Sequence, residues 1–260
     1  MLFIVVFVVS ESVAAIRNIG LARFVTDDSW HPSEGLYNLL PMVAGTMLVT
    51  AGAVLLATPL GILLAIFCSS FAPGPVARGY RRLIALLAGV PSVVYGFWGL
   101  VTLVPLLGQI QPPGTSLLAG IVILSLMILP TVTLLAETSL AGVSDHYIRG
   151  AAALGLTRWA TVRQVVLPAA RPGIVAGVFL AGARAVGETM AVLMVCGNVV
   201  EMPQSLFDPV RTLTANIALE MSYAMGDHRS ALFVTGSALL LMIVLLVTAA
   251  QWAGRGRAHG

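Results

Sequence analysis

Two charged side chains, Arg184 and Glu188, lie four positions apart inside an apolar stretch that runs from Gly173 to Cys196. A guanidinium can bind a carboxylate or an oxyanion through two parallel hydrogen bonds. Residues four apart lie on the same face of a continuous helix, so we expect the two side chains to be within reach of each other. The stretch therefore predicts either a structural ion pair or a site that handles a negatively charged solute.

The position of Arg184 suggests a place near the middle of a membrane. Arg184 follows Gly173 by 11 residues, which is about 16 Å at 1.5 Å per helical residue, in a hydrocarbon core about 30 Å thick. An arginine at that depth costs about 2.5 to 3.5 kcal/mol on insertion scales and should face a cavity or a partner. Glu188 can form an ion pair with this arginine. Its negative charge can also weaken the binding of an anion, so that the anion can leave the site.

The composition is that of a membrane protein. Of the 260 residues, 58% are hydrophobic and 10% are charged, against about 25% charged in soluble domains. Each span needs about 20 apolar residues. Five runs reach that length, at residues 40–67, 83–107, 115–136, 173–196 and 230–252, and a shorter run opens the chain. We therefore predict an all-α, polytopic bundle of about six transmembrane helices.

The opening run has no basic residue before its apolar part and carries Glu11. A secretory signal normally begins with a basic region, so we interpret this run as a first transmembrane helix with a clipped start. An uncleaved signal and a helix lying on the membrane surface are the alternatives. The predicted organisation is residues 1–39 for this helix and an outer loop, then residues 40–260 for the main transmembrane domain.

The arginines predict the orientation, because cytoplasmic loops collect basic residues. With the amino terminus inside, the cytoplasmic segments would be 72–82, 138–171 and the C-terminal tail. They hold nine of the 14 basic residues: Arg78, Arg81, Arg82, Arg149, Arg158, Arg163, Arg171, Arg255 and Arg257. The opposite side holds four arginines and seven acids: Arg17, Arg23, Arg211, Arg229, Asp27, Asp28, Glu34, Glu201, Asp208, Glu220 and Asp227.

The inner segment 138–171 predicts two short helices. Residues 147–155 are rich in alanine, and Gly155 supplies a left-handed stop. Thr157 can then cap a second helix on which Trp159, Val162 and Val166 share one face. A helix, a glycine turn and a helix are expected on the cytoplasmic side.

The run RGAAALGLTRWATVRQVVLP resembles the EAA loop of ABC importer permeases. Ala151, Gly155, Val165, Leu167 and Pro168 fit the spacing of that motif, whereas Arg149 and Gly150 stand where the family usually has Glu and Ala. In the family this loop inserts a short helix into the ATPase subunit, so the resemblance implies that these five residues couple the chain to an ATPase. A surface helical hairpin without a docking partner is the alternative.

The chain has no lysine, and a P-loop needs one to reach the nucleotide phosphates. ATP hydrolysis is therefore expected in a partner subunit, with no cofactor bound by this chain. We do not expect an enzyme, because the histidines are scattered and show no metal or nucleophile spacing. Each is interpreted as a solvated histidine: His31, His146, His228 and His259.

Three further stretches, AGVPSVVYGFWGL, RAVGETMAV and SLFDPVRTLTANIA, are similar to the PstC-type permeases of phosphate importers. The resemblance implies the type I ABC importer permease fold in the bacterial inner membrane, in contact with lipid. With phosphate as the solute, we hypothesise from their charges and position that Arg184 and Glu188 line its path. The implied partners are a PstA-type permease, a PstB-type ATPase dimer and a PstS-type phosphate-binding protein, and no nucleic acid is expected. A permease for another oxyanion or small solute, and an ATP-independent channel or carrier, are the alternatives.

Small residues have packing roles in this interpretation. Gly173, Gly177 and Ala181 recur at four-residue steps, a spacing that lets helix backbones approach closely. Cys68 and Cys196 are expected to be free thiols that pack as small apolar residues.

Overall fold

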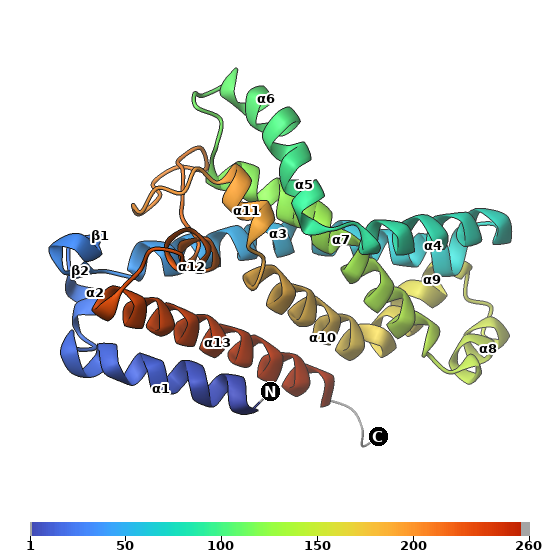
Figure 1. Ribbon diagram of the computed structural model, residues 1–260. Helices are drawn as coiled ribbons and strands as arrows, with labels where there is room; N and C mark the ends of the chain where they lie inside the picture. The colour runs from blue at the N-terminus through green and yellow to red at the C-terminus, as the bar shows by residue number, and fades with distance from the viewer. Residues whose placement is uncertain (1, 256–260) are drawn as a thin grey trace. The chain divides into compact units, whose positions relative to one another are not determined.

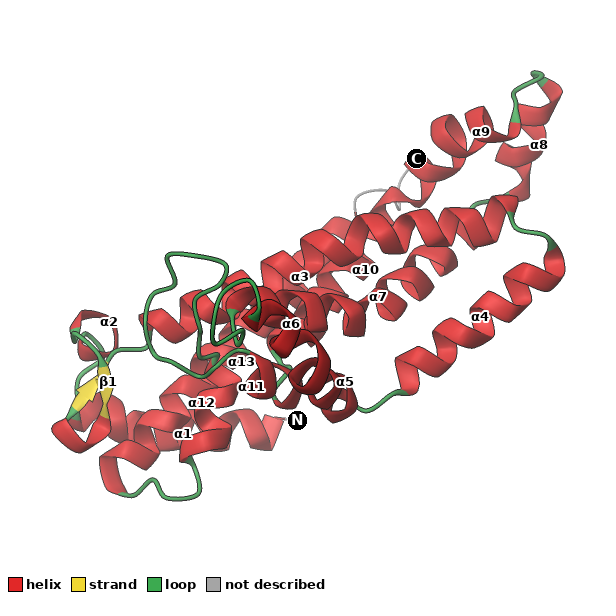
Figure 2. Ribbon diagram, turned by 90° about the horizontal axis from the view of Figure 1, so that it is seen from above, coloured by secondary structure: helices red, strands yellow, loops and turns green. Residues whose placement is uncertain are grey.

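The computed structural model describes residues 2–255, which are mostly helical with a short two-stranded antiparallel sheet (Figure 1; Figure 2). The all-α prediction is confirmed. Arg257 and His259, expected in the C-terminal tail, lie outside the described residues.

The elements follow in chain order, where η1 is a 3-10 turn and η2 to η4 are π-helical. They are α1 (Leu2–Asn18), α2 (Arg23–Thr26), β1 (Trp30–His31), η1 (Pro32–Glu34), β2 (Leu36–Tyr37), α3 (Leu40–Ile66), η2 (Phe67–Phe71), α4 (Gly74–Gly89), α5 (Ser92–Trp98), η3 (Gly99–Leu103), α6 (Val104–Gly108), α7 (Leu117–Ala141), α8 (Asp145–Ala153), α9 (Arg158–Thr161), η4 (Val162–Val166), α10 (Leu167–Val186), α11 (Met190–Val195), α12 (Leu213–Glu220) and α13 (Gly226–Arg255).

The chain forms two compact units. The first contains the residues up to 52 together with 91–124 and 185–244, and the second contains 53–90, 125–184 and the residues from 245. The long helices α3, α7, α10 and α13 each contribute to both units. Each unit therefore has its own core.

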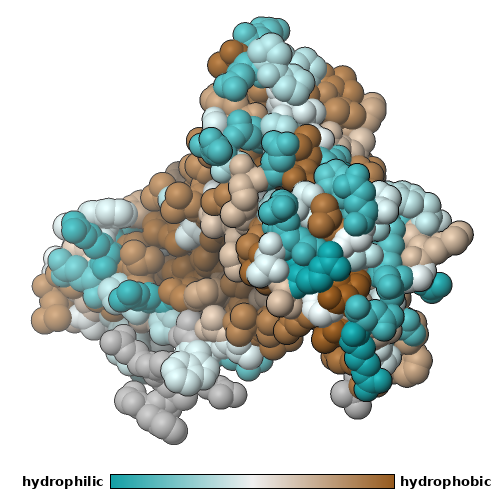
Figure 3. All heavy atoms as spheres, turned by 90° about the vertical axis from the view of Figure 1, so that its left-hand side faces the viewer, coloured by the Kyte–Doolittle hydropathy of each residue, from teal (hydrophilic) through white to brown (hydrophobic). Residues whose placement is uncertain are grey.

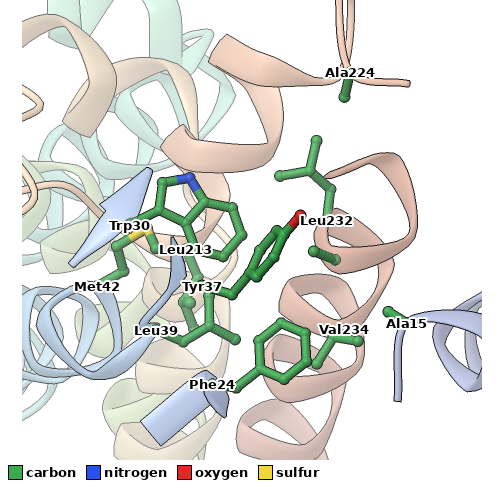
Figure 4. Close-up of a cluster of buried hydrophobic side chains, with 11 residues drawn as sticks. Ala15, Phe24, Trp30, Tyr37, Leu39, Met42, Leu213, Ala224, Leu232 and Val234 are labelled. Carbon is green, nitrogen blue, oxygen red and sulfur yellow. The ribbon is translucent and has the colours of Figure 1, made fainter. Parts of the chain in front are cut away.

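The core of the first unit is built around aromatic side chains. Trp30 and Tyr37 are paired across β1 and β2, with their rings edge to face at 5.9 Å, an arrangement that favours the sheet. Around them pack Leu39, which precedes α3, Met42 from α3 and Leu213 from α12 (Figure 4). This cluster holds the short sheet against the helices that carry the charged groups described below.

Helix α1 runs alongside α13 (Figure 1). Ser12 Oγ lies 2.8 Å from Ser237 Oγ, and the rings of Phe7 and Phe233 meet edge to face at 5.7 Å. The opening run is thus a helix packed on another helix of the same unit.

The second unit packs α10 on α7 through glycines. A Cβ added at Gly173 would lie 2.6 Å from Ser139 Oγ, and one added at Gly177 would lie 2.8 Å from Leu135 Cβ. Neither position has room for a side chain, and Ala181 is fully buried. The small residues therefore form a packing face, as predicted.

The inner segment has the predicted form. Ser144 caps α8, Gly155 takes φ +73°, and Thr157 Oγ1 accepts the N–H of Ala160 at 3.3 Å. From Arg158 the chain continues through α9 and η4 into α10 without a break. Residues 158–186 therefore form one continuous helical stretch.

Among the described residues, four helices are long and apolar enough to cross a membrane: Leu40–Phe71, Leu117–Ala141, Arg158–Val186 and Gly226–Trp252. The run expected at 83–107 is interrupted between α4 and α5 at Val90 and Pro91, and counting that pair as one span gives a fifth. Proline disfavours helical geometry in the residue before it, which explains the interruption. The predicted number of about six is thus approximate.

Apolar side chains also cover much of the surface, as the face in Figure 3 shows. Along the long helices they include Leu55, Leu63, Leu241 and Leu245, each more than half exposed. Lipid or a partner helix must cover such surfaces. Cys68 and Cys196 are free and buried, as predicted.

Candidate functional site

The predicted pair Arg184 and Glu188 falls at a break in the helix. α10 ends at Val186 and α11 begins at Met190, so the continuous helix expected over 173–196 is wrong. The physical reason lies in Glu188, whose Oε1 accepts the N–H groups of Thr189 at 3.1 Å and Ala191 at 3.3 Å. The carboxylate caps the start of a new helix, and the regular four-residue geometry that we expected between the two charges is lost.

Arg184 lies in the last turn of α10, and its side chain is exposed. A cation is favourable at this end of a helix, where the backbone carbonyls carry partial negative charge. Because α10 belongs to one of the apolar spans, exposure to lipid would be costly at this position. A water-filled path or a partner chain would provide favourable surroundings for the guanidinium.

Glu188 is half-buried and uses one carboxylate oxygen for capping. Within the described part of the chain, no hydrogen bond reaches its second oxygen, Oε2. That oxygen can therefore accept a hydrogen bond from a donor outside this chain.

The position of α11 is fixed by α5. A Cβ on Gly96 would lie 2.8 Å from Ala191 Cα and 3.0 Å from Met194 Sδ, so the two helices touch backbone to backbone. Ala191 is fully buried in this contact. The amide that Glu188 caps is therefore held in place by a neighbouring helix.

A second group of charges lies in the first unit and was not predicted. Glu220, 6% exposed, has its Oε1 2.7 Å from Arg211 Nη1, while its Oε2 accepts the indole N–H of Trp30 at 2.9 Å and lies 2.9 Å from His228 Nε2. An ionised carboxylate only accepts hydrogen bonds, so the His228 nitrogen is the donor. His228 is not a solvated histidine, which corrects our expectation.

This group forms one wall of a cavity of about 730 Å³, lined also by the exposed residues His31, Glu201 and Tyr223. The pKa of Tyr223 is raised by burial and by the charge of Glu220. The four partners come from β1, the segment before α12, α12 and α13. No local sequence pattern predicts that these four residues lie together, because Trp30 and His228 are 198 positions apart.

The predicted coupling residues lie in the second unit, along the inner segment. Ala151 is 4% exposed whereas Gly155 is exposed in the turn. Val165 belongs to η4, and Leu167 and Pro168 begin α10. Most of the rest of α8 faces outward, with Tyr147 60% exposed, and Leu154, which follows its last residue, is 82% exposed. An apolar helix surface of this kind is typical of a docking site.

Comparison with known proteins identifies relatives over most of the chain. The family described as "Binding-protein-dependent transport system inner membrane component" matches residues 57–257. The probable ABC transporter permease protein YqgH of Bacillus subtilis is 41% identical, covering 89% of this chain and 77% of that protein. The phosphate transport system permease protein PstC of Mesorhizobium japonicum is 37% identical over 88% of this chain and 77% of its own length.

Solved structures agree in fold. The MetNI methionine ABC transporter is similar with a TM-score of 0.67 at 21% identity, covering 84% of this chain and 94% of that one. A bacterial ABC transporter that imports alginate is similar with a TM-score of 0.67 at 14% identity, covering 96% and 89%. At these identities the likeness concerns the fold, which is that of type I ABC importer permeases.

Proposed function

The chain belongs to the family of binding-protein-dependent transport system inner membrane components, and from that premise we propose that it is a permease subunit of an ATP-driven phosphate importer. It is a multi-pass protein of the inner membrane. The observation that carries the proposal is the helix break, where an exposed arginine lies in the last turn of α10 and Glu188 follows, with one carboxylate oxygen to which no described residue donates a hydrogen bond. The similarity to PstC permeases supports phosphate as the solute.

In this proposal Arg184 and Glu188 line the phosphate path with different tasks. The guanidinium of Arg184 binds two phosphate oxygens in parallel. Glu188 Oε2 accepts a hydrogen bond from a protonated phosphate oxygen, which inorganic phosphate has near neutral pH and sulfate lacks. The negative charge of Glu188 also weakens retention of the anion, and conduction requires a site that the solute can leave.

The exposure of Arg184 supports a second permease subunit. A single chain leaves this cation uncovered, and a PstA-type partner would enclose the path from the other side. Hydrophobic surfaces on α3 and α13 are available for such a partner or for lipid.

The energy source in this proposal is a PstB-type ATPase dimer that binds α8. The exposed Tyr147 and Leu154 supply the apolar contact, and Ala151, Gly155, Val165, Leu167 and Pro168 couple its movement to α10. This places the segment 138–171 and the C-terminus in the cytoplasm, and the opposite face toward a PstS-type phosphate-binding protein. ATP is used by the partner, and this chain binds no cofactor.

Uptake of labelled phosphate by cells that carry the complete importer tests the proposal. A charge-assisted hydrogen bond contributes about 1.5 to 3 kcal/mol, so Arg184→Gln should reduce uptake by about ten-fold or more, and Glu188→Gln should reduce it as well. Arg82→Gln, on an exposed residue of α4, is the control for loss of one arginine, and the amount of assembled complex is measured for each variant. Normal uptake in both Arg184→Gln and Glu188→Gln would remove the assignment of this path.

The same preparation separates the rival functions. Uptake of another oxyanion or small solute in place of phosphate would identify a different substrate for the same fold. Purification without any nucleotide-binding subunit, together with uptake that does not need ATP, would identify a channel or carrier.

A further inference from the structure

We propose that Thr214 is a positioning residue for the phosphate path, because its hydroxyl fixes the main chain at Glu188. The inference rests on the proposed function and assigns a role to a residue 26 positions away in sequence. Thr214 Oγ1 donates to the main-chain oxygen of Glu188 at 2.7 Å, and Thr214 is 5% exposed. Thr214 belongs to the first turn of α12, which lies in the same unit as Glu188.

The Glu188 carbonyl needs this donor because of its place in the break. α10 has ended and α11 has not begun, so no regular helical N–H is supplied to that oxygen. A polar main-chain group without a partner is costly inside a protein. The side chain of Thr214 replaces the missing helical bond and so fixes the break itself.

The direction of the hydrogen bonds around Thr214 is determined. Thr212 Oγ1 lies 3.0 Å from Thr214 Oγ1 and accepts the N–H of Ala215 at 3.2 Å. Each hydroxyl has one proton, and that of Thr214 is given to the Glu188 carbonyl. The Thr212 hydroxyl is therefore the donor to Thr214 Oγ1, and the Thr214 hydroxyl is the donor to the Glu188 carbonyl.

The start of α12 is itself held by α3. The N–H of Leu213 donates to Thr46 Oγ1 at 3.0 Å, and Thr46 is 2% exposed. Nearby, a Cβ on Gly45 would lie 2.8 Å from the main-chain oxygen of Arg211, so α3 and the segment before α12 are in close contact. Thr214 therefore ties Glu188 to a rigid support.

Two contacts set the direction of the Glu188 carboxylate. Oε1 is held by the amides of α11, and the main chain of Glu188 is held by Thr214. Without the Thr214 hydroxyl, residues 187–189 can shift and move Oε2 from the place where it meets a phosphate proton. The expected defect is in recognition of phosphate rather than in assembly of the complex.

The experiment compares Thr214→Val, which keeps the shape and loses the donor, with Thr214→Ser, which keeps the donor. Thr235→Val is the matched control, because Thr235 is fully buried and its hydroxyl bonds to Ala231 of its own helix at 3.2 Å. Labelled phosphate uptake by the complete importer is measured against phosphate concentration and pH, per amount of assembled complex.

Thr214→Val should raise the phosphate concentration at half-maximal uptake by between about two-fold and about ten-fold, the range of one hydrogen bond. It should also shift the pH dependence of uptake, because in this proposal Glu188 accepts a hydrogen bond from the protonated phosphate oxygen. Thr214→Ser and Thr235→Val should match the wild type. In a Glu188→Gln background the main-chain bond persists but no carboxylate is left to position, so Thr214→Val should add little.

The proposal is overturned if Thr214→Val matches the wild type or Thr235→Val. It is also overturned if Thr214→Ser is as defective as Thr214→Val, or if the loss is unchanged in the Glu188→Gln background. Wild-type uptake is measured first, so absence of phosphate transport rejects the proposed function before any variant is compared. A lower yield of complex with unaltered half-saturation and pH profile identifies a purely structural threonine.

Discussion

Arg211 and Glu220 form a largely buried ion pair, with Nη1 2.7 Å from Oε1 and side-chain exposures of 19% and 8%. Arg211 also donates from Nε to the carbonyl of Asn198 and from Nη1 to Asn216 Oδ1. Together with Trp30 and His228, the pair joins four segments of the first unit, namely β1, the connection between α11 and α12, α12 itself and α13. A buried carboxylate with this number of donors stabilises the fold only while all of them are present.

Replacement of Glu220 should therefore destabilise the protein. Glu220→Ala leaves Arg211 without its counter-charge, and breaking a buried ion pair costs about 3 to 5 kcal/mol. Thermal unfolding of the detergent-solubilised complex should show a clearly lower midpoint. Glu201→Ala, on an exposed residue of the same cavity, should change the midpoint little. Equal midpoints for the two variants would contradict a structural role for Glu220.

Gly96 provides a test of the contact between α5 and α11. Gly96→Ala would place a Cβ 2.8 Å from the backbone of Ala191, which must push the helices apart at a cost of about 1 to 3 kcal/mol. Because Ala191 gives its amide to Glu188, we expect phosphate uptake per assembled complex to fall.

The control for this prediction is Gly79→Ala in α4, where a Cβ would meet nothing within 4 Å. Alanine favours a helix over glycine by about 1 kcal/mol, so this variant should be as stable as the wild type or more so. Uptake by Gly96→Ala equal to that by Gly79→Ala would show that α11 tolerates displacement.

Much of the fold could be predicted because helices and turns are local. The apolar runs located the long helices, Gly155 took the left-handed conformation, and Thr157 capped its helix. The glycine spacing likewise indicated the face by which α10 contacts α7. Each of these features depends on residues within one or two turns of each other.

The helix break and the buried charges could not be found in the same way. A hydropathy average over about 20 residues is insensitive to a three-residue interruption, although Gly187 followed by a capping residue was an available signal. The partners of Glu220 are distant in sequence, and only tertiary packing brings them together. The pairing of Arg184 with Glu188 was expected because a straight helix was assumed.

The pH dependence of stability can be tested at the loop before α3. Burial raises the pKa of Asp27, but the N–H of Tyr37 and the Arg23 guanidinium outweigh it, and the net pKa is lowered. A lowered pKa in the folded state means that Asp27 stabilises the loop above its unfolded pKa of about 3.9 and loses this effect as the pH falls through the folded value.

Asp27→Asn should accordingly be less stable than the wild type at neutral pH. The difference in unfolding midpoint should shrink toward zero as the pH falls below about 4. Asp28→Asn, on the next residue, is the control. A difference that stays constant from neutral to acid pH would exclude the charge of Asp27 as its cause.

The exposed apolar surface formed by α8 and the residue that follows it should bind the ATPase subunit, and that residue, Leu154, is its most prominent side chain at 82% exposure. A desolvated contact of this size typically contributes about 2 kcal/mol to an interface, so Leu154→Asp should weaken ATPase binding about thirty-fold. The measurement is the amount of ATPase subunit retained when the complex is purified through this chain. Val76→Asp in α4, 51% exposed, is the control for a new acid on an apolar surface.

Leu154 follows the last residue of α8, so the substitution leaves the helix itself intact, and Ala151 remains buried against its own unit. Loss of the ATPase with Leu154→Asp but not with Val76→Asp would locate docking on α8. Phosphate uptake should fall in proportion to the ATPase that is lost, because in this proposal the ATPase acts on α10 through α9 and η4, which continue into it. If both variants keep the ATPase, the inner segment is a helical hairpin whose exposed face has another purpose.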